Sequence, residues 1–256
     1  MKQRIIVFAN QKGGVGKTTT TVNLAAALAL TGRRVLLVDM DPQGNASTHL
    51  GAKPTKDQLT TYELLLKEAP FKDVVVNAKQ NIDILPTDIR LADAEIELPT
   101  LHGKDVRLKM ALESATDYHY ILIDSPPSLG QLTLNALTAA KELMVVVEAE
   151  VFAFEAVAHL MKTVGLTQKY CNPDLKLAGV ICTNFQGNLN LNKEIYDLIN
   201  ENFGAIAFKT AVRKNVKLGE APAKKKDIFE FDDSCTGAQD YAALCKELIA
   251  MEGRSE

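Results

Sequence analysis

The fold is decided by one stretch of sequence, Ile5-Ile6-Val7-Phe8-Ala9-Asn10-Gln11-Lys12-Gly13-Gly14-Val15-Gly16-Lys17-Thr18-Thr19. Its apolar opening predicts a buried strand, and the alanine-rich sequence that follows it predicts a helix. A glycine-rich loop joins the two. This order of strand, loop and helix favours a loop that binds phosphate over a glycine-rich turn with an incidental lysine.

Each part of this loop has a physical role in binding a nucleotide. Glycines let backbone N–H groups curl around phosphate oxygens, and the helix N-terminus adds partial positive charge. Lys17 can bridge the terminal phosphates, and the Thr18 hydroxyl can bind Mg²⁺. The strict phosphate-loop motif is not met, because Gln11 stands where its first glycine belongs and a second lysine, Lys12, follows. The predicted nucleotide contacts in the loop are Lys12, Gly13, Gly14, Val15, Gly16, Lys17, Thr18 and Thr19.

Acidic residues follow two other predicted strands. Asp39 and Asp41 come directly after residues 35–38, and Asp124 follows residues 120–123. Ligands collect at the carboxyl ends of parallel strands, so these acids are expected beside the loop. A single aspartate would more simply be a helix cap, but three around a phosphate loop favour a site. We assign Asp39 and Asp124 to Mg²⁺ and Asp41 to orienting the attacking water.

Apolar runs alternate with helical periods along the chain, which predicts an α/β fold. We expect a mostly parallel, twisted sheet with helices on both faces, of the P-loop NTPase type, as one domain over residues 1–256. The expected strands are residues 5–9, 35–38, 82–85, 120–123, 143–147 and 177–182. The expected helices are residues 18–30, 59–67, 106–115, 132–140, 154–170, 191–202 and 238–251, and residues 51–57 and 224–234 are expected to be surface loops.

Composition sets limits on the class of protein. The 256 residues are 46% hydrophobic, and the apolar run near the N-terminus is far shorter than a membrane span needs. The four cysteines form no C-x-x-C pair, which argues against a zinc site or a disulfide framework. These features predict a cytoplasmic protein.

Charge is unevenly distributed along the chain. The net charge is −3, yet residues 209–226 hold seven basic residues and one acidic residue, Glu220. An acidic body with one basic segment is expected of a protein with a confined anion-binding face, although charge runs are usually only solvated surface.

Several segments resemble one known family when taken together. The phosphate loop is followed by Val38-Asp39-Met40-Asp41-Pro42-Gln43-Gly44-Asn45, by Asp124-Ser125-Pro126-Pro127-Ser128-Leu129-Gly130 with Leu132-Thr133-Leu134-Asn135-Ala136-Leu137, and by Asn215-Val216-Lys217-Leu218-Gly219-Glu220-Ala221-Pro222. This set, which spans nearly the whole chain, resembles the ParA/Soj chromosome- and plasmid-partition ATPases of the ParA/MinD superfamily, with a deviant Walker A loop.

The resemblance implies roles for individual residues in an Mg²⁺-dependent ATPase. ATP would lie between two subunits, and Lys12 would cross to the partner's phosphates, where other P-loop enzymes use an arginine finger. The resemblance also places the hydrolysis-competent acid at Asp41 and base contacts at Asn184, Asn215 and Pro222.

The resemblance further implies partners. The ATP-bound homodimer would bind DNA without sequence preference on the nucleoid, and a ParB/Spo0J-like partner would stimulate hydrolysis. The expected DNA contacts are Arg213, Lys214, Lys217, Lys224, Lys225 and Lys226. The chain departs from the family here, with Arg213-Lys214 where Pro-Arg is common and Lys224-Lys225 where His-Gly or a similar pair occurs.

Two other functions remain open from the sequence. The same ATPase could position another cargo, such as a chemoreceptor array or a carboxysome-like body. A metabolic or electron-transfer relative is disfavoured, because a cluster-binding reductase needs a cysteine near the second switch and no cysteine precedes Cys171. No helix-turn-helix segment precedes the first strand, so we do not expect the operator-binding, autorepressing type of plasmid ParA. The acidic last helix lacks the basic amphipathic character of a membrane anchor, so we expect no membrane partner.

Overall fold

A computed structural model describes residues 3–150 and 153–252 of the chain. Its strands are β1 (Arg4–Ala9), β2 (Val35–Asp39), β3 (Val76–Lys79), β4 (Ile82–Leu85), β5 (Tyr120–Asp124), β6 (Glu142–Glu148) and β7 (Lys176–Thr183). They form one seven-stranded sheet in the order β3-β4-β2-β5-β1-β6-β7. Neighbouring strands are parallel except β3, which runs antiparallel to β4 at one edge.

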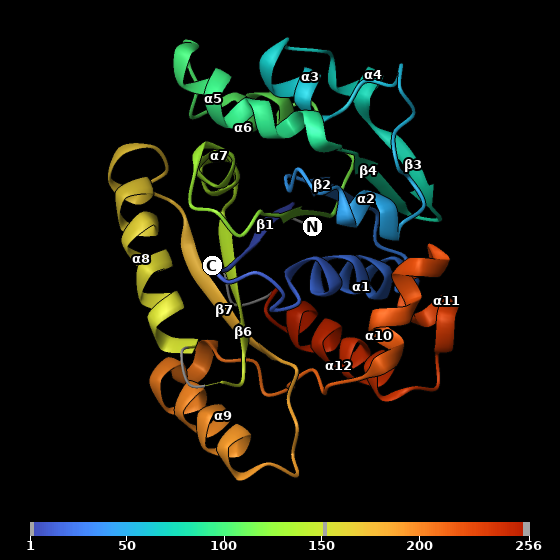
Figure 1. The fold of residues 1–256 in the computed structure, drawn as a ribbon, viewed down its shortest axis with the longest axis vertical. Coiled ribbons are helices and arrows are strands. Elements are labelled where there is room, and N and C mark those ends of the chain that lie inside the picture. Colours follow the sequence, from blue (N-terminus) through green and yellow to red (C-terminus); the bar gives the residue numbers. More distant parts are fainter. Residues whose placement is uncertain (1–2, 151–152, 253–256) are drawn as a thin grey trace.

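Helices cover both faces of this sheet. The longer ones are α1 (Lys17–Leu30), α7 (Gln131–Ala139), α8 (Ala153–Tyr170), α9 (Asn190–Phe203) and α12 (Thr236–Ala250). The shorter ones are α2 (Asn45–His49), α3 (Thr61–Leu66), α4 (Phe71–Val74), α5 (Ala94–Glu97), α6 (Arg107–Leu112), α10 (Val216–Glu220) and α11 (Ile228–Asp232), with 3-10 turns η1 (Ile89–Asp93), η2 (Leu98–Thr100), η3 (Gly204–Ile206) and η4 (Ala221–Lys224). Figure 1 shows α1 and α12 on one side of the sheet and α7 and α8 on the other.

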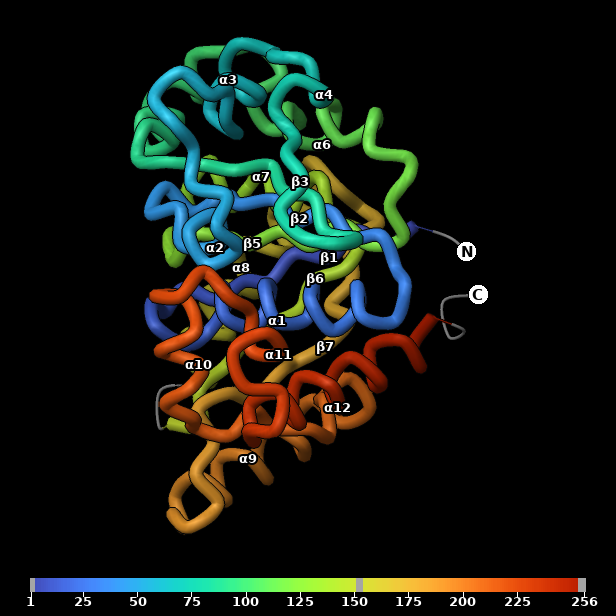
Figure 2. The backbone as a smooth tube through the Cα atoms, turned by 90° about the vertical axis from the view of Figure 1, so that its right-hand side faces the viewer, coloured from blue at the N-terminus to red at the C-terminus, as the bar shows by residue number. Residues whose placement is uncertain are grey.

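The alternation of side chains along β1 divides the core in two. Val7 and Ala9 pack with the cluster under α7 and α8, whereas Ile6 and Phe8 pack with the cluster under α1 and α12. Successive residues of a strand point to opposite faces, so a central strand must be apolar throughout. Figure 2 shows α12 alongside α1, with α10 and α11 next to them.

The expected mostly parallel sheet with helices on both faces is confirmed, and the six expected strands agree with the structure within one residue at each end. The missed strand is β3, which has four residues and alternates apolar with polar side chains. The loop expected at 224–234 is wrong in part, because η4 ends at Lys224 and α11 follows. Asp227 caps α11 by accepting hydrogen bonds from the N–H groups of Phe229 and Glu230, and Ile228 is buried beneath it.

Among residues 3–150 and 153–252, no helix combines the length and apolar character needed to cross a bilayer.

Candidate nucleotide site

The phosphate loop lies between β1 and α1, with its conformation fixed at both ends. Asn10 donates from Nδ2 to the Val146 carbonyl at 2.6 Å and accepts the Lys12 N–H at 3.0 Å. Gly14 and Gly16 have φ values of 77° and 87°, which favour glycine. Gly16 is the N-cap of α1 and no side chain caps this helix, so its first N–H groups are suited to a bound anion.

Lys17 is a buried cation beneath the loop. Its side chain is 6% exposed, and Nζ donates to the Lys12 carbonyl at 3.1 Å. Burial lowers the pKa of Lys17, and the charges of Asp124 and Asp41 oppose that shift. The structure therefore places Lys17 between the loop and the acidic residues.

Asp39 and Asp124 lie side by side, because β2 and β5 are adjacent and pair these residues in register. Both are fully buried. Burial raises the pKa of Asp39 to about 7; the Asp41 charge adds to this shift, and hydrogen bonds from Ser47 oppose it. Burial and the neighbouring Asp39 charge raise the pKa of Asp124. Two carboxyl groups held this close favour a bound cation, which would stabilise their charged forms.

The donor set fits Mg²⁺, which prefers hard oxygen ligands and often shares them with phosphate. Thr18 donates from Oγ1 to Asp124 Oδ2 at 2.7 Å, so a hydroxyl and a carboxylate already meet at the start of α1. Asp39 is also predicted to help hold Mg²⁺, and this stays a prediction. Its Oδ2 accepts hydrogen bonds from Ser47 N and Oγ at 2.8 and 2.7 Å, which suits a supporting position better than a direct contact.

Asp41 follows β2 and is 8% exposed. Its Oδ1 accepts the Gln43 N–H at 3.0 Å, and its carbonyl accepts the Gly44 N–H at 2.8 Å. These bonds hold the turn that leads into α2, so Asp41 lies on the same sheet edge as Asp39 and Asp124.

Lys12 occupies the outer side of the loop. Its side chain is 43% exposed and forms ion pairs with Glu148 and Glu150. Asn184 donates to the other oxygen of Glu148 at 3.1 Å. Exposed ion pairs of this kind contribute little stability, so Lys12 can exchange them for another anion.

The predicted base contacts have other partners in this structure. Asn215 caps α10, where its Oδ1 accepts the Lys217 N–H, and its Nδ2 donates to Thr236. Pro222 lies in η4. Among the described residues, no hydrogen bond joins Asn184 or Asn215 to the phosphate loop. Instead Thr183 at the end of β7 donates to the Val15 carbonyl at 2.7 Å.

The basic segment divides into two groups. Arg213 forms a bidentate contact with Asp240, and Lys217 pairs with Glu220 at 3.5 Å. Among the described residues, Lys214 and the three lysines of 224–226 form no ion pair and are exposed. Arg213 thus contacts α12, whereas Lys214 and the three lysines of 224–226 present their charge to solvent.

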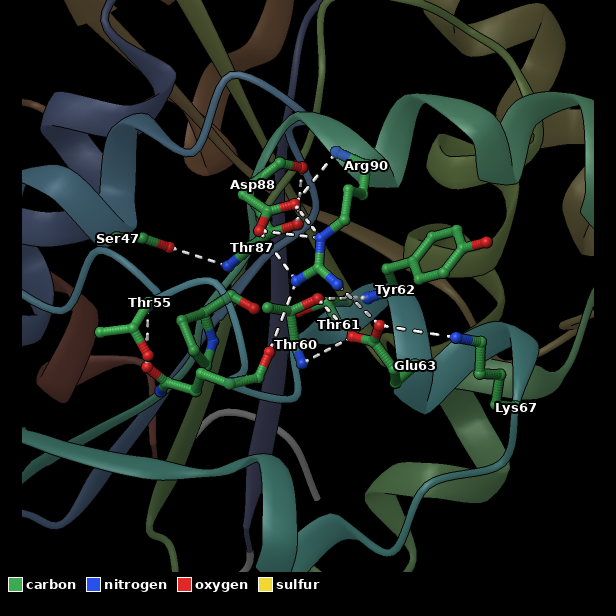
Figure 3. Close-up of polar contacts among 12 residues, drawn as sticks. Ser47, Thr55, Thr60, Thr61, Tyr62, Glu63, Lys67, Thr87, Asp88 and Arg90 are labelled. Carbon is green, nitrogen blue, oxygen red and sulfur yellow. Dashed lines mark hydrogen bonds and ion pairs between the residues drawn. The ribbon is translucent and has the colours of Figure 1, made fainter.

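Sequence reasoning missed Ser47, Glu148 and Glu150, which contact residues of the site. Glu148 ends the largely apolar strand β6, so the rule applied to Asp39 and Asp124 would have found it. Ser47 carried no such signal, because its role depends on α2 folding back toward Asp39. Figure 3 shows its second contact, in which Ser47 Oγ accepts the Thr87 N–H at 3.0 Å.

The fold and the site define a class: an α/β nucleotide-binding protein with a phosphate loop after its first strand and acidic residues at neighbouring strand ends. A family model described as an AAA domain (AAA_31) matches residues 3–177.

Known proteins narrow the class. The chain is 44% identical over 249 residues to the sporulation initiation inhibitor protein Soj of Bacillus subtilis, covering 96% of this chain and 98% of that relative. It is 41% identical over 253 residues to the chromosome partitioning protein ParA of Caulobacter vibrioides, covering 97% and 95%. The solved structure of cobyrinic acid a,c-diamide synthase from Mycobacterium smegmatis with bound ATP analog and magnesium matches with a TM-score of 0.85 and 33% identity, covering 98% and 96%. The chain belongs to the Soj/ParA family of chromosome-partitioning ATPases.

Proposed function

We propose that this chain acts as a single-domain, Mg²⁺-dependent ATPase whose ATP-bound homodimer binds DNA on the nucleoid. A ParB/Spo0J-like partner would stimulate hydrolysis and so release the dimer from DNA. The observation that carries the proposal is the arrangement of Lys17, Thr18 and Asp124 around the uncapped start of α1. That arrangement fits a nucleoside triphosphate with its metal ion.

The chain's residues divide the work of binding. The N–H groups from Gly13 to Thr19 and the Lys17 ammonium would hold phosphate oxygens, and Thr18 and Asp124 would hold Mg²⁺. When it is bound, Mg²⁺ neutralises negative charge on the phosphates. Asp41 would orient a water molecule near the loop. Asp39, held by Ser47, would add negative charge that favours the metal.

Self-association is supported by Lys12. A lysine on the outer side of a phosphate loop, held only by exposed ion pairs, can leave Glu148 and Glu150 for the phosphates of a second copy. Such a contact would form only in the dimer, so it would make ATP the link between two chains.

DNA binding is supported by the exposed lysines. Lys214 and residues 224–226 place four ammonium groups on one segment, and a dimer would double that number. Contacts to phosphate alone give binding that is insensitive to sequence and falls with salt.

Two experiments test the proposal. Size-exclusion chromatography with ATP should show Asp41→Ala as a trapped dimer and Lys12→Ala as a monomer, with Lys109→Ala as the exposed-lysine control. Fluorescence anisotropy on unrelated DNA duplexes should show tighter binding with ATP than with ADP or without nucleotide. A Lys12→Ala variant that dimerises normally would remove the role given to Lys12. Equal DNA affinity in all nucleotide states would contradict the whole proposal.

A second candidate is an ATP-dependent ligase, because the protein named for corrinoid diamide synthesis matches at 33% identity. The basic segment has no evident role in such a reaction, and the relatives of Caulobacter vibrioides and Myxococcus xanthus, at 41% and 42% identity, are named as chromosome partitioning proteins. ATP turnover that requires a corrinoid carboxylate and an amine donor, and that ignores DNA, would favour the ligase.

A further inference from the structure

The short helix α2 connects the nucleotide site to the rest of the molecule. It begins after the Asp41 turn, at Gly44, whose φ is 60° and where a Cβ would lie 2.8 Å from the Thr87 carbonyl oxygen. Ser47 donates from N and Oγ to Asp39, and Ser47 Oγ also accepts the Thr87 N–H. Figure 3 shows this last contact. Three contacts therefore fix the first turn of α2 to the Asp39 side of the site.

The other end of α2 carries His49, which is 2% exposed. Its Nε2 lies 3.0 Å from the Lys226 carbonyl oxygen. A carbonyl oxygen can only accept, so Nε2 must carry the hydrogen. Burial and the nearby Lys79 charge lower the pKa of His49 to about 4, against the opposing effect of this hydrogen bond. His49 is thus a neutral donor near pH 7.

The residues that meet this end of α2 are 224–226, which we name the lysine turn. Lys225 adopts a left-handed conformation with φ of 56°, and its Cβ lies 3.5 Å from the position that a Cβ on Gly51 would take. Lys79 donates to the Lys225 carbonyl at 3.4 Å. The backbone of the turn rests on α2 and β3, while its three side chains are exposed. Figures 1 and 2 show α2 close to the α10 and α11 region that contains this turn.

We propose that His49 is a positioning residue that ties the lysine turn to the Asp39 side of the nucleotide site. This inference rests on the proposed function and deepens it. A displacement of Asp39 or of the Asp41 turn is passed to α2 through Ser47 and Gly44, and His49 passes it to the Lys226 carbonyl. The nucleotide state then sets where the three ammonium groups lie on the DNA-binding face.

The test distinguishes the loss of the hydrogen-bond donor at position 49 from a change in the shape of the side chain. His49→Phe fills the space without a donor, whereas His49→Gln keeps an N–H that can reach the carbonyl. We expect His49→Phe to weaken DNA binding in the ATP state about fivefold, the effect of losing one hydrogen bond, and His49→Gln to stay within about twofold of the unmodified protein. DNA affinity with ADP and affinity for a fluorescent ATP analogue should not change. His159→Phe, on the exposed side of α8, is the matched control.

Several outcomes overturn the inference. A His49→Phe variant that binds DNA as the unmodified protein does, or that loses affinity equally with ATP and ADP, excludes the positioning role. If His49→Phe does not fold, hydrogen exchange of the unmodified protein decides. The Lys225 and Lys226 amides, bonded to Pro222 and Ala221, should change protection together with α2 when ADP is replaced by an ATP analogue, and unchanged protection overturns the inference. Loss of ATP-dependent DNA binding in the unmodified protein would instead refute the proposed function.

Discussion

The two ends of the parallel strands differ in how their charged residues are arranged: opposite charges are paired at one end, and like charges are adjacent at the other. At the amino ends, Arg4 forms a bidentate pair with Glu142 at 2.8 and 2.5 Å, and Arg33 pairs with Glu252 at 3.1 and 3.2 Å. At the carboxyl ends, Asp39 and Asp124 are buried beside each other.

This difference shows where the fold is stabilised and where it is prepared to bind. Paired charges at the amino ends support the folded state. Like charges at the carboxyl ends oppose folding, but they add affinity for a cation and its phosphates. The same sheet therefore separates a structural edge from a binding edge.

The largest effect is expected for Lys17→Ala. Lys17 is the buried cation of the binding edge, so its loss should weaken ATP binding by roughly 100-fold, about 3 kcal/mol. Equilibrium binding of a fluorescent ATP analogue measures this change. Lys12→Ala is the control and should change monomer affinity much less, because Lys12 is exposed. Similar losses of ATP affinity for both variants would show that the burial of Lys17 does not make it the stronger contact.

Arg4→Met tests the structural edge. It leaves Glu142 without its bidentate partner, and since Glu142 is partly exposed we expect a loss of about 2 kcal/mol in the free energy of unfolding, below the range for fully buried pairs. Urea denaturation measures the loss, with exposed Lys109→Met as the control. A change equal to the control would mean that this pair is not stabilising.

Acid should lower the free energy of unfolding through protonation of His49. The unfolded state binds a proton near pH 6.5, whereas the folded pKa is about 4. Between these values the unfolded state binds more protons, so the free energy of unfolding falls as pH decreases. Relative to His49→Gln, the unmodified protein should lose up to about 2 kcal/mol between pH 7 and pH 5. Parallel pH curves for the two proteins in denaturant titrations would contradict this.

Asp124→Asn should raise stability by removing the like-charge repulsion at the binding edge. It removes the charge beside Asp39 but keeps an oxygen that can accept from Thr18, so the free energy of unfolding should rise by about 1 kcal/mol. Thermal unfolding without nucleotide should show an increase of about 2–4 °C, and the Mg²⁺ dependence of ATP binding should decrease. Glu142→Gln, at the other edge, should lower the melting temperature. A destabilised Asp124→Asn would show that this charge is compensated.

The smallest effect is expected for Lys225→Gly. Lys225 has φ of 56°, a conformation that costs an L-residue about 1 kcal/mol, and the greater freedom of glycine in the unfolded chain offsets part of the gain. We expect about 0.5 kcal/mol of added stability and a two- to threefold loss of DNA affinity, roughly one lost phosphate contact. Lys224→Gly, which lacks this strain, should not be stabilised. Unchanged DNA affinity would remove Lys225 from the contacts.

Much of this architecture could be predicted from the sequence, because central strands must be apolar and a phosphate loop needs a fixed order of residues. Asp39 and Asp124 were found by the same reasoning. Ser47, His49 and Glu150 could not be found, since their partners are set by how loops fold back. β3 was missed because Val76–Lys79 lacks an apolar run, and α11 because a single aspartate cap starts it.

The edge strand β3 has a consequence for assembly. Open edges can recruit strands from other molecules, but bulges and charged side chains make them poor templates. The β3 register shifts between Asn77 and Lys79, and Lys79 forms ion pairs with Glu230 and Asp227 of the α11 region. This blunted border disfavours pairing of β3 with a strand of another molecule.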